Sequence, residues 1–192
     1  MSGEEVAKSM LGYYGLSSVS VVSVPGKLTD HYNPLNKTVN LSPEVFQGRS
    51  VASAAIAAHE CGHAVQHSTS YFWLGMRSKM VPVVNASSRI MQFVFMASLF
   101  GMYSLSMGGN TILLVLIATQ AVIASFAVIT LPVEYDASRR ALVWLKGAGI
   151  TNPQNHSMAE DALKWAARTY LVAAVAAVTT LLYYVMLYLR RN

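Results

Sequence analysis

Long uncharged runs divide the chain into a polar N-terminal part and an apolar C-terminal part. Residues 90–133 contain no Asp, Glu, Lys or Arg, and another apolar run lies between Arg168 and Arg190. A transmembrane helix needs about 20 apolar residues, so the longer run accommodates two spans and a turn. The pattern therefore predicts spans at about 83–105, 111–132 and 170–189, with a turn at Ser106–Asn110.

The first 80 residues predict a short helix, three short strands and a long helix. Ser2 and Glu5 have the spacing of a capping box, which predicts a helix over 2–11. Runs rich in β-branched residues, bounded by Pro and Gly, predict strands at 19–24, 28–32 and 37–41. We expect the second strand to form a hairpin with the first. Ser42 and Pro43 predict one helical turn, and Ser50 is the expected N-cap of an alanine-rich helix reaching about His67.

Composition supports a membrane protein. Hydrophobic residues make up 54% of the chain and charged residues only 12%, whereas soluble domains have about 25% charged residues. The net charge is +5, but the basic residues are scattered and no nucleic-acid-binding module is recognisable. We therefore expect the lipid bilayer and its anionic headgroups, and no nucleic acid, as partners. A single cysteine, Cys61, excludes an intramolecular disulfide, and the acidic start Met1–Glu5 lacks the apolar region of a signal peptide.

The long helix carries an H-E-x-x-H pattern at His59, Glu60 and His63. Positions i and i+4 lie on one face of an α-helix, so both imidazoles can bind one Zn²⁺. Glu60 lies beside that face, where it can take a proton from a zinc-activated water as general base. The alternative is a buried helix in which both histidines have only structural hydrogen bonds. Cys61 occupies a variable position of the pattern and is expected to be a packed free thiol.

Glu134 is the candidate third ligand. After Glu60 the sequence has only four more acidic residues, and Glu134 directly follows the second predicted span. A hairpin returns the chain to the face it left, so Glu134 can meet His59 and His63 without crossing lipid. Catalytic zinc commonly has three protein ligands and one open position. The alternative is an interfacial carboxylate paired with Arg139.

Other polar residues remain alternatives for contacts around the site. His67 stands about 12 Å along the helix from His59, so both cannot bind one ion. Asp136 is expected to pair with Arg140 at i,i+4 or to contact a ligand histidine. His31 is a candidate for stabilising a transition state, with a surface strand residue as the equal alternative. Three further donors near Glu134 stay open as candidates, namely Tyr135, Arg139 and Arg140.

The pattern predicts a mainly α integral membrane protein with four segments. Its expected parts are a zincin-like H-E-x-x-H helix, a small β element and about three transmembrane helices. The positive-inside rule places the polar segments in the cytoplasm, although Arg190 and Arg191 oppose this orientation.

Strand 37–41 is our candidate edge strand for pairing with an extended substrate. The segments are 1–80 with the motif helix, 81–132 as a transmembrane hairpin, 133–168 with the third ligand, and 169–192 as a further span.

Three separated stretches give the chain a family resemblance. They are Leu28–Pro34, His59–Gln66 and Leu131–Ala141. With these stretches in this order, the chain resembles the YugP-type membrane zinc metallopeptidases of bacteria, whose members usually begin with an additional transmembrane helix. The resemblance implies zinc held by His59 and His63, Glu60 as general base and Glu134 as third ligand. The more distant gluzincin membrane proteases carry an Asp four residues after that Glu, where this chain has Ser138.

Together these patterns predict a metalloendopeptidase of the bacterial plasma membrane. One catalytic zinc would activate the water that attacks a peptide carbonyl, with Glu60 moving the proton. A site near the bilayer surface implies protein or peptide substrates that are membrane-bound or membrane-proximal. The alternative is a non-proteolytic membrane protein, in which zinc joins the polar part to the helices or the chain assists a partner complex.

Overall fold

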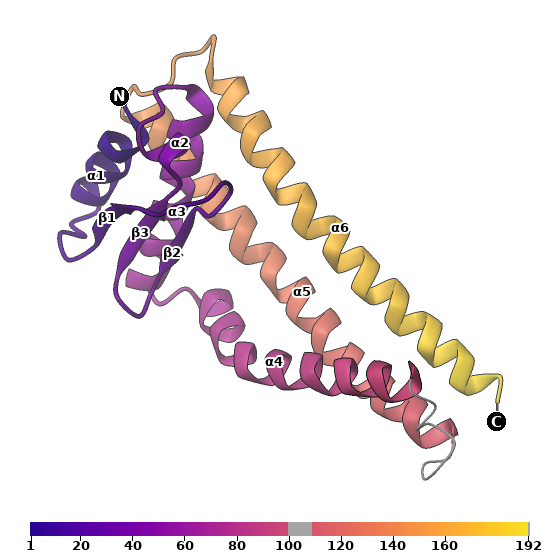
Figure 1. Ribbon diagram of the computed structural model, residues 1–192. Helices are drawn as coiled ribbons and strands as arrows, with labels where there is room; N and C mark the ends of the chain where they lie inside the picture. The colour runs from indigo at the N-terminus through magenta and orange to yellow at the C-terminus, as the bar shows by residue number, and fades with distance from the viewer. Residues whose placement is uncertain (100–108, 192) are drawn as a thin grey trace. The chain divides into compact units, whose positions relative to one another are not determined.

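The computed structural model describes residues 1–99 and 109–191, which form two compact units. Unit 1 contains Met1–Gly75 and Pro132–Arg168, and unit 2 contains Met76–Leu131 and Thr169 onward. Unit 1 thus joins the first 75 residues to a segment that lies far downstream in the sequence (Figure 1). The four segments predicted above are a finer division and stay a prediction.

Helix α1 (Gly3–Tyr13) begins with the predicted capping box. The Glu5 backbone N–H donates to Ser2 Oγ at 3.3 Å, and the Ser2 N–H donates to Glu5 Oε2 at 2.8 Å. These two bonds satisfy donors that a helix start leaves without intrahelical partners. The apolar face of α1, including Val6 and Met10, is fully buried in the core of unit 1. The predicted N-terminal helix is therefore confirmed.

Three strands form one small sheet, β1 (Ser20–Ser23), β2 (His31–Asn33) and β3 (Thr38–Leu41), in the order β1-β3-β2. Strand β3 pairs in parallel with β1 and antiparallel with β2. The first and third predicted strands are confirmed. The second begins at His31 rather than at Leu28, and the predicted hairpin between the first two strands is wrong. Strand 37–41 is also the central strand rather than an edge. Val39 and Leu41 are fully buried, whereas Val22 of β1 is exposed, so burial explains why β3 takes the centre.

Helix α2 (Pro43–Phe46) is the predicted helical turn, but Ser42, the residue before it, has another role than capping. The Ser42 side chain makes no capping bond. Its hydroxyl and its backbone N–H instead donate to the Asp30 carboxylate at 3.1 and 2.8 Å. Asp30 therefore joins the loop before β2 to the start of α2.

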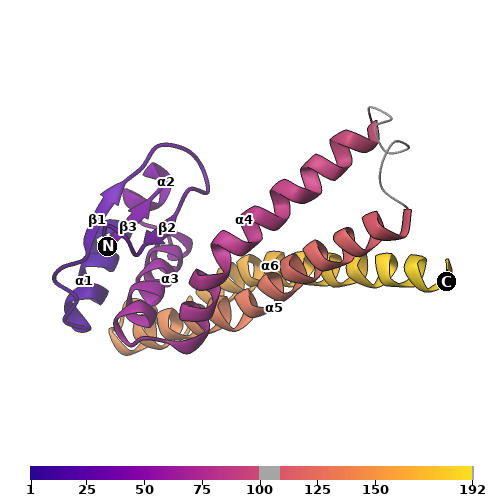
Figure 2. The ribbon, with the colours of Figure 1, turned by 90° about the horizontal axis from the view of Figure 1, so that it is seen from below.

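Helix α3 (Val51–Ser68) crosses the middle of unit 1. Ser50 caps it as predicted, because the Ser53 N–H donates to Ser50 Oγ at 3.0 Å. The sheet packs against α3, as both views show (Figures 1 and 2). The alanines on α3 let neighbouring elements approach closely. Around it, the core gathers side chains from α1, β3 and the downstream segment, including Met10, Leu41, Ala58, Trp144, Leu145 and Leu163.

Three long helices follow, α4 (Phe72–Leu99), α5 (Gly109–Gly147) and α6 (His156–Leu189). Two helical segments are long and apolar enough to cross a membrane, Asn110–Gly147 and His156–Leu189, with mean hydropathies of 2.6 and 2.0. They contain the predicted second and third spans. The end of the first predicted span and most of the predicted turn lie outside the described residues. Within unit 2, the Gln120 amide donates to the Ala177 carbonyl at 2.8 Å and so links α5 to α6.

Candidate metal centre

Three side chains of unit 1 converge at one point. His59 and His63 stand one turn apart on α3, with ring planes 85° apart and centroids 4.8 Å apart. Glu134 comes from α5, and its Oε2 lies 3.3 Å from His59 Nε2 and 3.5 Å from His63 Nε2. All three side chains are largely buried. The ligand atoms lie within 4.8 Å of one another, so this is a group able to hold a metal ion.

The two nitrogen–oxygen distances in this group fit zinc. Zinc bonds to nitrogen and oxygen are about 2.0–2.2 Å long, so two ligand atoms of a tetrahedral ion lie about 3.4 Å apart. The two nitrogen–oxygen distances of 3.3 and 3.5 Å match this value. Two imidazoles and one carboxylate are also a typical catalytic zinc set that leaves a fourth position open.

Gly62 determines how closely α3 approaches α5. A Cβ added to Gly62 would lie 2.6 Å from the Ala137 carbonyl oxygen and 3.1 Å from the Ala137 carbonyl carbon. Real Cβ atoms do not approach backbone that closely, so any larger residue would push the two helices apart. Ala137 lies less than one helical turn after Glu134 on α5. Close backbone contact at Gly62 therefore brings the Glu134 carboxylate onto the two histidines.

Gln66 fixes the orientation of His63. The fully buried Gln66 amide nitrogen donates to the Val133 carbonyl at 2.8 Å and to Asp136 Oδ2 at 2.9 Å. Its oxygen is thereby directed at His63 Nδ1, 3.0 Å away, and must accept from it. A proton on Nδ1 leaves the lone pair of neutral His63 on Nε2, the atom that faces Glu134. Sequence reasoning did not identify this role, although the i,i+3 spacing of His63 and Gln66 was a signal.

Ser138 has the corresponding place beside His59. Its Oγ lies 3.1 Å from His59 Nδ1, on the opposite side of the ring from Nε2. Ser138 is the residue at which the sequence departs from the more distant membrane proteases. Ser138 gives the histidine a neutral hydroxyl as its hydrogen-bonding partner. The sequence identified the position, while only the structure shows the contact.

Asp136 supports the site through Gln66. Its two carboxylate oxygens accept from Arg139, from Arg140 and from Gln66. The pair with Arg140 is the i,i+4 ion pair expected from the sequence. Hydrogen bonds from Arg140, Gln66 and Arg139 outweigh burial and lower the pKa of Asp136. Asp136 therefore remains charged and holds Gln66 in place.

Burial and charge act in opposite directions on the cluster. Burial alone raises the pKa of Glu134, but hydrogen bonds and charge from His59 and His63 outweigh it and hold that pKa far below its ordinary range. Burial alone lowers the pKa of His63, but Glu134, Glu60 and Gln66 together raise that pKa. Glu134 is therefore a charged carboxylate that stabilises positive charge at the two histidines.

Glu60 lies next to the cluster and is 8% exposed. In the described ranges, 1–99 and 109–191, its carboxylate makes no hydrogen bond and no ion pair. Its charge contributes to raising the pKa of both His63 and Cys61, so the carboxylate lies near these groups. The Cys61 thiol is fully buried, its Sγ lies 3.6 Å from the Ala7 carbonyl, and burial raises its pKa. The thiol is therefore packed, as the sequence predicts.

The remaining candidates lie outside the three-residue group. His31 is exposed and its Nδ1 bonds to the Thr29 carbonyl at 2.7 Å. His67 Nδ1 bonds to the Tyr32 hydroxyl at 2.9 Å, which joins β2 to the end of α3. Arg139 is mostly exposed apart from its bond to Asp136, and Tyr135 is half exposed. The structure thus brings together His59, His63 and Glu134, and it places His31 and His67 in other contacts.

Comparison with known proteins agrees with this geometry. A family model described as "Putative neutral zinc metallopeptidase" matches residues 1–189. "Putative membrane protease YugP" of Bacillus subtilis (strain 168) is 38% identical over 188 residues, which cover 98% of this chain and 81% of that protein. No solved structure matches the chain.

The contact at Gly62 predicts a destabilising Gly62→Ala substitution. The added methyl group must displace the Ala137 backbone, and overpacking of this kind costs about 1–3 kcal/mol. We expect a lower denaturation midpoint and weaker zinc binding, measured by chemical unfolding and by competition with a zinc chelator. Gly12→Ala in α1 is the control, since no atom lies within 4 Å of its Cβ position. Equal behaviour of the two variants would contradict the close contact.

The hydrogen bonds of Gln66 predict weaker zinc binding in Gln66→Met. Methionine fills similar space but cannot accept from His63 Nδ1, and losing such a partner costs about 10–100-fold in metal affinity. Chelator competition measures the affinity, and circular dichroism checks the fold. Gln154→Met, in an exposed loop, is the control. A folded Gln66→Met protein with unchanged zinc affinity would show that Gln66 does not orient His63.

Proposed function

Because the chain belongs to the neutral zinc metallopeptidase family, we propose that it is a membrane-embedded zinc metalloendopeptidase with Glu60 as general base. The observation that supports this most is the convergence of His59, His63 and Glu134 beside the buried Glu60 carboxylate. Each group needed for metal-assisted amide hydrolysis is present within one unit. Glu134 would be the third protein ligand, a position that an imidazole or a thiolate occupies in some other catalytic zinc sites.

His59, His63 and Glu134 would hold one zinc ion in this mechanism. Zinc supplies Lewis acidity, which lowers the pKa of a bound water and polarises the substrate carbonyl. Glu60 takes a proton from the attacking water and later delivers it to the leaving amine. Gln66 and Ser138 keep the imidazole rings in position during this cycle, because each bonds the Nδ1 that faces away from Glu134.

The position of the site near the membrane suggests its substrates. Glu134 lies two residues after the predicted 111–132 span, on a helix apolar and long enough to cross a membrane. The relative from Bacillus subtilis is itself described as a membrane protease. These observations support substrates that are membrane proteins or lie close to the bilayer. We propose that the site lies on the cytoplasmic face of a multi-pass protein of the bacterial plasma membrane. Most of the Lys and Arg residues lie in the segments on the side of the site, whereas the predicted turn Ser106–Asn110 carries none.

Removing the general base gives a direct test. Glu60→Gln keeps the size of the side chain but cannot accept a proton, so peptide cleavage should fall by about 10²–10⁴-fold. Zinc content, measured by mass spectrometry of the metal, should remain equal to wild type. The assay uses zinc-loaded full chain in detergent with casein and a peptide library. If zinc-loaded wild type cleaves none of these, the non-proteolytic alternative is favoured.

The third ligand is tested separately from activity. Glu134→Ala removes the oxygen 3.3 and 3.5 Å from the two histidine nitrogens, so the zinc-to-protein ratio after dialysis should drop sharply. His67→Ala removes a histidine from the same helix that bonds Tyr32 instead, and its zinc content should stay at the wild-type value. Full zinc content in Glu134→Ala, or loss of zinc in His67→Ala, would contradict the proposed ligand set.

A further inference from the structure

Two leucines of unit 1 are the most exposed large apolar side chains in the part of the chain that the structure describes. Leu28 is 92% exposed and Leu35 is 94% exposed. Phe93, which lies in a predicted span and is therefore expected to face lipid, is 72% exposed. Exposure of this degree leaves almost the whole side chain of each leucine in contact with water, which is unfavourable for apolar surface.

Ordered turns hold both leucines outward. In the loop between β2 and β3, the Leu35 backbone N–H donates to Asn33 Oδ1 at 2.9 Å. In the loop between β1 and β2, Leu28 has a φ of 56°, a left-handed conformation that a leucine rarely adopts. Two residues later, the Asp30 carboxylate accepts from the Ser42 N–H and fixes the base of this loop. The exposure of both side chains is therefore built into the turns that carry them.

The two leucines flank one strand, the edge strand β2. The loop of Leu28 leads into β2 at His31, and the loop of Leu35 follows β2 after Asn33. A strand advances about 3.3 Å per residue, so the three residues of β2 separate the two loops by about 10 Å. Strand β2 pairs with β3 alone, so no other described strand covers its outer side. Leu28 and Leu35 therefore stand at the two ends of one open edge.

Strand β2 lies on the side of unit 1 from which the chain leaves for the predicted spans. The Tyr32 hydroxyl on β2 is 2.9 Å from Nδ1 of His67, in the last turn of α3. The chain leaves unit 1 after Gly75 and returns to it at Pro132. Just before that exit, the Tyr71 hydroxyl donates to the Pro132 carbonyl at 3.4 Å, so the exit and the return are neighbours. The open edge is therefore close to the place where unit 1 would meet the membrane.

The residues beside the two leucines suit a bilayer surface. Neither loop tip, 25–28 or 34–37, contains an acidic residue, and each contains one lysine. A lysine next to an inserted side chain can keep its ammonium group among the lipid headgroups. Lys27 is 3.1 Å from Glu44, but both groups are mostly exposed, so this ion pair is weak. Lys37 makes no ion pair with any residue in the described ranges.

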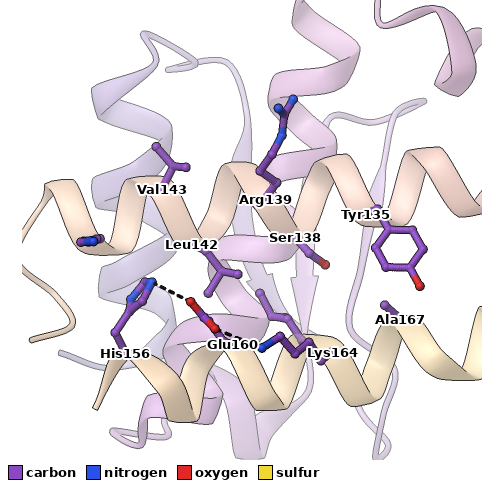
Figure 3. Close-up of a pocket in the computed structure, with 11 residues that line it drawn as sticks. Tyr135, Ser138, Arg139, Leu142, Val143, His156, Glu160, Lys164 and Ala167 are labelled. Atoms are coloured by element: carbon purple, nitrogen blue, oxygen red, sulfur yellow. Dashed lines mark hydrogen bonds and ion pairs between the residues drawn. The ribbon is translucent and has the colours of Figure 1, made fainter. Parts of the chain in front are cut away.

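The groove between α5 and α6 is a comparison surface on the same unit. Figure 3 shows Glu160 between His156 and Lys164, and its carboxylate lies 3.8 Å from His156 Nε2 and 3.1 Å from Lys164 Nζ. The carboxylate thus has its partners within the groove. Val143 of α5 is 66% exposed there and lies about 16 Å along the helix from Pro132. It is therefore an exposed apolar residue remote from the point where the chain enters unit 1.

We propose that Leu28 and Leu35 insert into the surface of the surrounding bilayer and hold the open edge of β2 along it. Their side chains enter the first methylenes of the acyl chains, while Lys27 and Lys37 stay among the headgroups. Because Tyr32 links β2 to the last turn of α3, this contact also holds the helix of the candidate metal centre at the membrane surface. The inference rests on the proposed membrane placement of the chain but not on peptidase activity.

Site-specific labels test the contact on the full chain in vesicles of phosphatidylcholine and phosphatidylglycerol. The native Cys61 thiol is fully buried, so only an added cysteine takes the label. The variants Leu28→Cys and Leu35→Cys each carry a nitrobenzoxadiazole dye. A nitroxide near the carbonyl end of the acyl chain should quench about half or more of the fluorescence at both positions, since interfacial apolar side chains lie about 5–10 Å into the headgroup boundary.

The matched control carries the same dye at Val143→Cys. It should lose less than about a tenth of its fluorescence, because this position lies roughly 16 Å along α5 from Pro132. Equal quenching at all three positions would mean that the dye itself enters the bilayer. Quenching at neither leucine position, or at one alone, would mean that the edge of β2 does not lie along the membrane. Each of these results overturns the proposal.

A photoactivatable lipid tests the wild-type chain without a dye. Trypsin cuts after Lys27 and Lys37, so residues 28–37 form one peptide that contains both leucines. The yield of lipid adduct on this peptide should fall at least about fivefold in Leu28→Ser/Leu35→Ser, because burial of each leucine favours insertion about tenfold or more. Residues 147–164 form a control peptide that should stay unlabelled in both proteins. An unlabelled 28–37 peptide in the wild type, or an unchanged yield in the double variant, would contradict insertion.

Carbonate extraction of cell membranes distinguishes this failure from failure of the proposed function. A chain that remains in the membrane pellet but shows no lipid contact at Leu28 and Leu35 refutes the insertion alone. A chain released by carbonate refutes the membrane placement on which both proposals depend.

Discussion

The contact between Gly62 and the Ala137 backbone is the constraint on which the candidate site depends. Two histidines on one helix provide only part of a zinc site, and the remaining ligand belongs to a helix more than 70 residues downstream. Only a residue without a side chain lets the two backbones lie close enough for Glu134 to reach both rings. The small residues of α3 therefore serve the position of the ligand as well as the packing of the core.

The buried polar groups behind His63 are joined by a network of hydrogen bonds. Gln66 is fully buried and uses both ends of its amide, one on His63 and the other on Asp136 and Val133. Asp136 in turn is held by two arginines. Such a network has few alternative arrangements, because breaking one bond leaves a buried polar group unsatisfied. The rings are consequently held in one orientation before any ion binds, which lowers the cost of ordering them.

Local signals in the sequence predict the elements well, and non-local contacts explain what it misses. Ser2, Glu5 and Ser50 act on neighbours three residues away, so the predicted helix starts are confirmed. The pairing of β1 with β3 depends on which strand is most buried, which short patterns do not contain. Glu134 could be proposed because few carboxylates follow Glu60. The contact of Ser138 with His59 spans 79 residues and needs the close approach at Gly62, so no pattern along the chain predicts it.

Anomalous diffraction at the zinc edge from crystals of the zinc-loaded chain tests the central claim most directly. The account predicts one peak about 2.0–2.2 Å from Nε2 of His59, Nε2 of His63 and a carboxylate oxygen of Glu134. It also predicts that Gln66 and Ser138 remain bonded to the opposite nitrogens of the two rings. A peak bound by both histidines with Glu134 outside bonding distance, or a peak at His67 or Cys61, would contradict it.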